Sequence, residues 1–114
     1  MKGVRELNLE LGRPTVDQAL NRLRADMAAC RHMHQGVMKL IHGYGSSGSG
    51  GRIRAAVRKY LAAELAEGRV KAVIRGEDFS IFSEETRRML AQYPLLRQDS
   101  DLDWENRGVT FVIL

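Results

Sequence analysis

The sequence is poor in the features that mark secreted and membrane proteins. It has a single cysteine, Cys30, among 114 residues, so no disulfide can form within the chain. No hydrophobic run is long enough to span a bilayer, and residues 1–12 lack the apolar core of a signal peptide. We therefore expect a cytoplasmic protein that does not enter a membrane.

Acidic residues are missing from the middle of the chain. None occurs between Asp26 and Glu64, whereas six basic residues fall there: Arg31, Lys39, Arg52, Arg54, Arg58 and Lys59. Residues 1–75 carry 14 Lys and Arg against 6 Asp and Glu, while residues 76–114 carry 4 against 8. Such asymmetry favours a polyanionic partner, of which nucleic acid is the commonest. A solvated basic face without a partner is the alternative that composition leaves open.

Length and hydrophobic patterning indicate one α/β domain over residues 1–114. The 44% hydrophobic and 28% charged residues are typical of a soluble globular chain with a single core. Periodicity predicts a helix from Thr15, whose spacing to Gln18 fits a capping box, to a stop near Gly36. The other predicted elements are strands at 4–11, 37–41, 70–74 and 109–114 and helices at 52–67 and 83–92.

The order of these elements predicts a two-layer α/β sandwich with a mixed sheet. A strand, helix, strand run of this length makes the first two strands parallel. The last strand, VTFVIL, is apolar on both faces, so we expect it to be central or covered on both sides. The helices should bury two apolar stripes: Val16, Leu20, Leu23, Met27 and Cys30, and Ile53, Val57, Tyr60, Leu61 and Leu65.

Residues 37–54, VMKLIHGYGSSGSGGRIR, run from a strand through a glycine-rich loop into a helix. This geometry binds anions, because the free N–H groups of the first helical turn point outward and glycines allow close approach. GYGSSG formally matches G-x-G-x-x-G, but it follows the second strand and no acidic residue stands at the expected distance. No Gly-Lys-Ser/Thr ends the loop, so it is not a P-loop. A small phosphate or nucleotide ligand remains an alternative.

Two side chains of this loop have open roles. His42 can hold a phosphate when protonated or transfer protons, or it can simply bond to nearby backbone. Tyr44 can stack on a base or pack on the sheet edge. The other candidates are interpreted as structural: Cys30 as core, His32 and His34 as surface, and Ser46, Ser47 and Ser49 as loop residues. No Cys or His cluster has the spacing of a zinc site.

Two stretches resemble the Smr (small MutS-related) domain family: LNLELGRPTVDQAL, residues 7–20, and VMKLIHGYGSSGSGGRIRAAVRKYL, residues 37–61. The family's second motif, Ile-His-Gly-x-Gly, fits residues 41–45 position by position. VTFVIL resembles the family's last strand, and the similarity covers residues 5–61 closely. The resemblance implies a βαβαββ two-layer fold, in agreement with the pattern above, with a short extra helix inserted at about 79–107.

The resemblance also implies a function. The family is associated with binding DNA or RNA and, in many members, with endonuclease (nicking) activity that is metal-dependent or metal-independent. We therefore expect a nucleic-acid-binding domain, with a divalent metal only if it is a nuclease. The expected contacts lie in the loop and the following helix: His42, Gly43, Tyr44, Gly45, Arg52, Arg54, Arg58 and Lys59.

The chain departs from the family pattern in two places. Where the first motif has Leu-Asp-x-His, this chain has Leu7-Asn8-Leu9-Glu10. Glu10 can serve as a base or metal ligand beside His42 in an active nicking endonuclease, or cleavage has been lost and binding kept. The second departure is the acidic insertion, with Asp99, Asp101, Asp103 and Glu105, which can cap the sheet, bind a partner or compete with nucleic acid.

Overall fold

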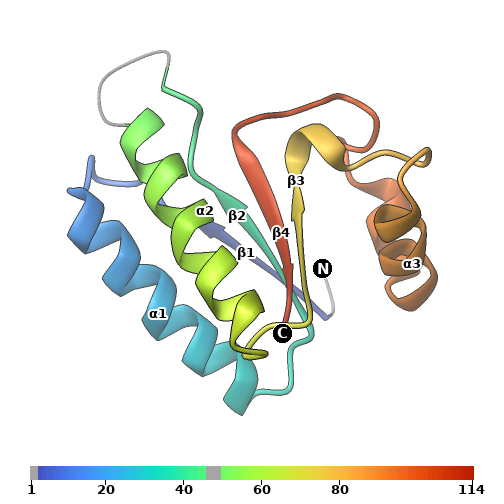
Figure 1. Cartoon of the computed structure of the whole chain (residues 1–114), viewed down its shortest axis with the longest axis horizontal. Coiled ribbons are helices and arrows are strands. Elements are labelled where there is room, and N and C mark those ends of the chain that lie inside the picture. The colour runs from blue at the N-terminus through green and yellow to red at the C-terminus, as the bar shows by residue number, and fades with distance from the viewer. Residues whose placement is uncertain (1–2, 46–49) are drawn as a thin grey trace.

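A computed structural model describes residues 3–45 and 50–114 of the chain. Its sheet has four strands in the order β1-β2-β4-β3 (Figure 1). The strands are β1 Val4–Asn8, β2 Val37–Ile41, β3 Ala72–Arg75 and β4 Val109–Ile113. β1 and β2 are parallel, and β4 runs antiparallel to both of its neighbours. The mixed sheet expected from the sequence is confirmed.

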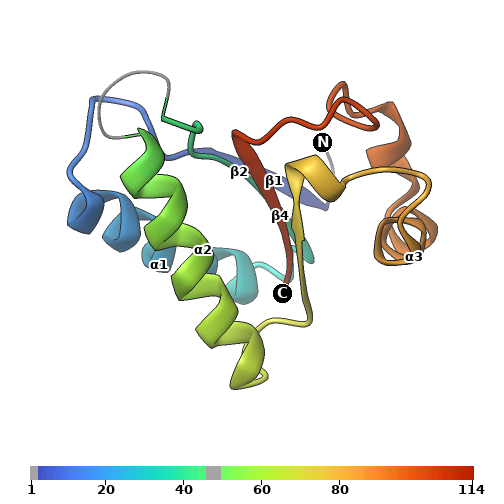
Figure 2. The same ribbon diagram turned by 45° about the horizontal axis from the view of Figure 1, so that its top comes forward.

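Helices cover both faces of this sheet. α1 (Val16–His32) and α2 (Gly50–Ala66) lie on one face, and α3 (Glu84–Gln92) lies on the other (Figures 1 and 2). Two short 3₁₀ helices, η1 (Gly76–Asp78) and η2 (Pro94–Gln98), flank α3 in the chain. The βαβαββ order with a helix before the last strand is confirmed. The inserted segment extends the expected two layers by covering the second face of the sheet.

β4 is central, as its apolar sequence predicts. All five of its residues are buried, and it pairs with β2 on one side and β3 on the other. Its alternate side chains enter two separate cores. Val112 packs toward α1 and α2, whereas Phe111 packs toward α3, with its ring centroid 4.2 Å from that of Phe79.

The predicted helix start at Thr15 is confirmed in atomic detail. The Thr15 hydroxyl accepts a hydrogen bond from the Gln18 backbone N–H, and the Gln18 side chain accepts one from the Thr15 N–H at 2.9 Å. Ser83 caps α3 in the same way, accepting from the Thr86 N–H. Each cap satisfies backbone donors that have no partner within the helix.

The buried face of α2 ends at residue 64, one residue earlier than predicted. Ile53, Val57 and Leu61 are buried, but Leu65 is 43% exposed and Glu64 is buried in its place. Residue 64 continues the 3.6-residue period from residue 61, and the Glu64 carboxylate is satisfied by Tyr60 and Arg69.

Two strand bounds differ from prediction by more than one residue. β1 ends at Asn8 because the Asn8 side chain accepts a hydrogen bond from the Glu10 N–H at 2.9 Å and turns the chain. β3 begins at Ala72, although Val70 before it is buried in the core of α1 and α2. In the part of the chain that the structure describes, no helix is long and apolar enough to cross a membrane.

Candidate nucleic-acid interface

The ends of β1, β2 and β3 and the start of β4 meet at one edge of the sheet. Because β4 is antiparallel to β2, residues 107–110 lie beside the loop that follows Ile41. The backbone N–H groups of His42 and Gly43 both donate to the Gly108 carbonyl, at 2.9 and 3.1 Å. The beginning of the glycine loop is therefore tied to the segment that enters β4.

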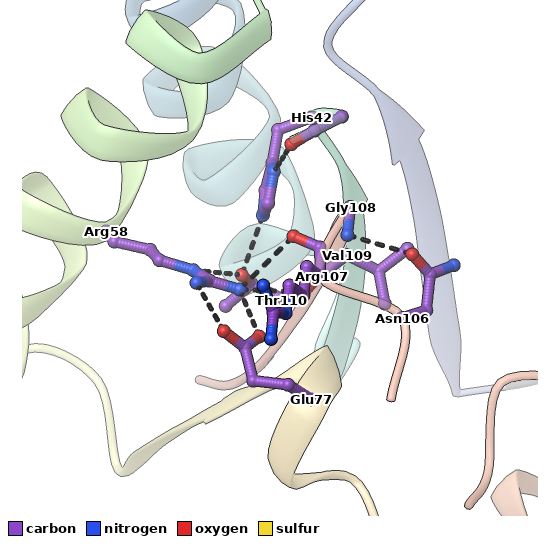
Figure 3. A network of polar contacts seen from close by, with 9 residues as sticks. His42, Arg58, Glu77, Asn106, Arg107, Gly108, Val109 and Thr110 are labelled. Atoms are coloured by element: carbon purple, nitrogen blue, oxygen red, sulfur yellow. Dashed lines mark hydrogen bonds and ion pairs between the residues drawn. The ribbon is translucent and has the colours of Figure 1, made fainter. Parts of the chain in front are cut away.

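His42, which follows β2, is fully buried. Its Nδ1 is 2.7 Å from the Gly43 carbonyl oxygen, and its Nε2 is 2.8 Å from Thr110 Oγ1 (Figure 3). A carbonyl can only accept, so Nδ1 carries the proton and Nε2 accepts from the Thr110 hydroxyl. Arg58 Nε in turn donates to Thr110 Oγ1 at 3.3 Å. Bonding to nearby backbone is the second of the two roles that the sequence left open for this histidine.

The surroundings of His42 keep its ring uncharged. Its pKa is lowered from 6.5 to about 4, chiefly by burial and also by the positive charges of Arg58 and Arg54, while the bond to the Gly43 carbonyl opposes the change. At neutral pH the imidazole is therefore neutral, with both nitrogens engaged inside the protein. In this arrangement it holds the loop and presents no cation to a phosphate.

Arg58, a predicted phosphate contact, is engaged in an ion pair. Its guanidinium forms a two-pronged contact with the Glu77 carboxylate of η1, at 2.6 and 2.9 Å, and also reaches the Val109 carbonyl at 3.4 Å (Figure 3). Burial alone would raise the pKa of Glu77, but the bonds from Arg58 bring it below its usual value. Arg58 thus links α2, η1 and β4 at a partly buried position.

Glu10 lies against the glycine loop. Gly43 has φ +71°, and a Cβ built there would meet Glu10 Oε1 at 1.7 Å. The carboxylate is exposed and the turn that carries it is fixed by Asn8. The structure therefore places Glu10 beside the His42–Gly43 peptide. Gly45 also has a positive φ, at +93°.

Four arginines converge on a hollow of about 440 Å³ at the same edge. They come from α2, from the end of β3 and from the segment before β4: Arg54, Arg58, Arg75 and Arg107. Two carboxylates, Glu77 and Glu105, also line it, so its formal charge is +2, from four cations less two anions. Arg52 and Lys59 are exposed elsewhere on α2, and Tyr44 is 56% exposed.

Sequence reasoning missed Arg75 and Arg107. A signal was present, because strands that run in opposite directions place the end of one and the start of the next at the same edge. Arg75 ends β3, and Arg107 stands just before β4. Without the sheet order, nothing singled them out from the other arginines.

Three residues that the sequence analysis interpreted as structural lie where it expected them. Cys30 is buried in the core, and His32 and His34 are exposed. Ser46, Ser47 and Ser49 lie outside the described residues. Within residues 3–45 and 50–114, no three His, Cys, Asp or Glu side chains are grouped so that they could hold a metal ion.

These features define a small mixed α/β domain with a histidine-glycine loop between its second strand and second helix. The family model of the Smr domain matches residues 9–78, more than half of the chain, so the chain belongs to the Smr domain family. This membership supports a domain of nucleic-acid-binding or nicking-endonuclease type in general.

A solved structure supports the fold. The chain is similar to the Smr domain of Thermus thermophilus MutS2, with 22% identity, 96% of each chain covered and a TM-score of 0.58. No curated protein matches the chain. The inserted segment from Phe79 onward lies beyond the residues that the family model matches.

Proposed function

We propose that this domain binds DNA or RNA through the edge of the sheet that carries the glycine loop. The observation that carries the proposal is the hollow lined by Arg54, Arg75 and Arg107 beside the loop. Guanidinium groups suit phosphate because they offer a planar set of donors and remain charged. Arg52 and Lys59, exposed on α2 outside the hollow, add to the positive charge that attracts a polymeric anion.

The buried residues give this surface its shape. His42 and Thr110 fix the start of the loop, and Glu77 holds Arg58 in place. Gly43 and Gly45 have positive φ angles, which let the backbone turn tightly, and at Gly43 the missing Cβ makes room for the Glu10 carboxylate. The binding groups are then Tyr44, the exposed backbone of Gly45 and the arginines of the hollow.

Binding should weaken steeply with salt. Each phosphate neutralised releases counterions, so we expect affinity to fall at least about 10-fold between roughly 50 and 200 mM salt. Arg54→Ala and Arg75→Ala should each lower the affinity about 5- to 10-fold and reduce the salt slope by about 1. Arg88→Ala is the matched control, since Arg88 on α3 is also an exposed arginine but lies outside the hollow. Fluorescence anisotropy with labelled oligonucleotides measures all four proteins.

Two results would contradict this proposal. Affinity that does not change with salt would rule out binding through phosphates. A thermal shift with mononucleotides and none with oligonucleotides would instead assign the loop to a small phosphate ligand.

Nicking is the second candidate, favoured by the contact between Glu10 and Gly43. Glu10 is exposed beside the loop, whereas both nitrogens of His42 are engaged, so Glu10 is the residue positioned to accept a proton from water. If the chain nicks, Glu10→Gln should lower the rate by about 100-fold or more while binding is kept. A nicking assay on a labelled plasmid, run beside the binding assay, measures this. Equal rates for wild type and Glu10→Gln would exclude that role.

A further inference from the structure

Trp104 is the sole tryptophan of the chain, and its side chain is 77% exposed. It stands in the inserted segment between two residues with left-handed backbone conformations, Asp103 at φ +66° and Glu105 at φ +51°. Residues other than glycine rarely adopt such angles, each at a cost of roughly 1 kcal/mol or more. The chain therefore sustains a strained turn that presents a large aromatic ring to solvent.

Hydrogen bonds and an ion pair fix this turn to the rest of the domain. The Asp103 N–H donates to the Phe79 carbonyl at 2.9 Å, and the Asp103 carboxylate accepts from the Ile81 N–H at 3.0 Å. Asp101, three residues before Trp104, accepts from the Asn106 side chain at 2.8 Å and pairs with Lys39 Nζ at 2.7 Å. An aromatic ring on a fixed support binds a flat ligand with little further loss of conformational freedom.

Trp104 shares a hollow of about 430 Å³ with Tyr44 of the glycine loop. Gly108 joins the two segments, since a Cβ built on it would lie 3.4 Å from Gly43 Cα and 3.5 Å from Tyr44 Cδ1. The fold thus brings Tyr44 and Trp104 to the same hollow, although they are 60 residues apart in the chain.

The chemistry of this hollow suits a nucleobase and not a phosphate. Its charged lining residues are Asp101, Glu105 and Arg107, so its formal charge is −1, in contrast to +2 for the arginine hollow. Carboxylates repel phosphate, and the exposed carboxylate of Glu105 can accept hydrogen bonds from the amino and imino groups on base edges, whereas that of Asp101 is engaged by Lys39 and Asn106. Glu105 and Arg107 line both hollows, so the two are adjacent.

We propose that the two hollows together bind one nucleotide with an unpaired base. The phosphate lies among the arginines, and the base lies in the hollow of Tyr44 and Trp104 and stacks on an aromatic ring. In a duplex the faces of each base are covered by its neighbours, so this subsite selects single-stranded or unpaired positions of DNA or RNA. The inference rests on the proposed function and specifies which form of nucleic acid the site prefers.

The fluorescence of Trp104 reports on the subsite directly, because no other tryptophan contributes. Adding a single-stranded oligonucleotide of about 16 nucleotides should quench it, since stacking on a base is the expected contact. Trp104→Ala and Tyr44→Ala should each weaken single-strand binding about 10-fold, and Trp104→Ala should change duplex binding less than about 2-fold. Phe82→Ala is the control, because Phe82 is 87% exposed but lines neither hollow. Thermal melts check that each variant is folded.

The possible outcomes separate this inference from the proposed function. If Trp104→Ala keeps single-strand affinity while binding still falls with salt, the base subsite is wrong and the phosphate surface stands. If wild type binds no oligonucleotide even at low salt, both are wrong. If the tryptophan spectrum changes with protein concentration in the absence of nucleic acid, the aromatic pair is a contact between copies of the chain, and the base subsite is again overturned.

Discussion

Replacing Lys39 by methionine lowers the free energy of unfolding by about 3–5 kcal/mol at pH 7. Lys39 lies on β2 and is 7% exposed, with its ammonium 3.0 Å from Asp99 and 2.7 Å from Asp101. Methionine fills a similar volume but leaves two nearly buried carboxylates without a cation. Equilibrium unfolding in urea, followed by far-UV circular dichroism, measures the change.

Removing the carboxylates as well should reverse much of this loss. Lys39→Met combined with Asp99→Asn and Asp101→Asn leaves no unpaired charge, so we expect it to be clearly more stable than Lys39→Met alone. Lys71→Met is the control for an exposed lysine and should change stability by less than about 0.5 kcal/mol. If Lys39→Met loses no more stability than Lys71→Met, the ion pair is not formed in solution.

The ion pair also sets a pH range for stability. Burial would raise the pKa of Asp101, but the bonds from Lys39 and Asn106 bring it below its usual value. Burial would lower the pKa of Lys39, but the bonds to Asp101 and Asp99 bring it above its usual value. The carboxylate contribution is complete above the unfolded pKa, near 3.9, and is lost as pH falls through the folded value. The ammonium contribution is complete below about 10.4 and is lost as pH rises through the folded value.

Acidification from pH 7 to pH 5 removes about 2 kcal/mol of stability through His42 alone. The folded pKa of His42 is about 4 against 6.5 for the free side chain. Between about pH 6.5 and pH 4 this histidine is protonated in the unfolded chain but not in the folded chain. The loss of stability therefore grows as pH falls, and it levels off near 3 kcal/mol below about pH 4. Urea unfolding at the two pH values gives the difference.

His42→Gln should be less stable at pH 7 but should lose about 2 kcal/mol less than wild type between pH 7 and pH 5. We thus expect His42→Gln to be less stable than wild type and its stability to depend less on pH. The loss of packing and hydrogen bonds alone would lower the stability without changing its pH dependence. His32→Gln, which changes an exposed histidine, should keep the wild-type pH dependence. If His42→Gln keeps it too, His42 is not buried and neutral in the folded chain.

Sequence reasoning succeeded where the deciding contacts are local. The Thr15–Gln18 capping box needs residues three apart, and the burial of β4 follows from VTFVIL itself. Sequence reasoning left alternatives open where a partner comes from far along the chain. His42 is buried because Thr110, 68 residues away, completes its hydrogen bonds. A lone histidine at the end of a strand gives no sign of that partner.

Lys39 shows the same limit in the charge pattern. Its side chain leaves β2 on the face opposite His42, among the residues that pack on α3. Counting it within the acid-free segment assigned it to the basic surface, but the inserted Asp99 and Asp101 neutralise it in the interior. Part of the acidic insertion therefore serves the fold, and the cations left for a ligand come from α2, β3 and the approach to β4.

The position of β4 has a consequence for how the site is assembled. β4 lies between β2 and β3 in the sheet, so a chain that contains only the first three strands cannot join β3 to the others. Thr110 and the Gly108 carbonyl, which hold His42 and the loop, arrive with the strand that fills it. Such pairings between distant segments form late, because closing a long loop is entropically costly. The contacts that engage the His42 ring and fix the backbone of residues 42–43 can therefore form only with the strand that completes the sheet.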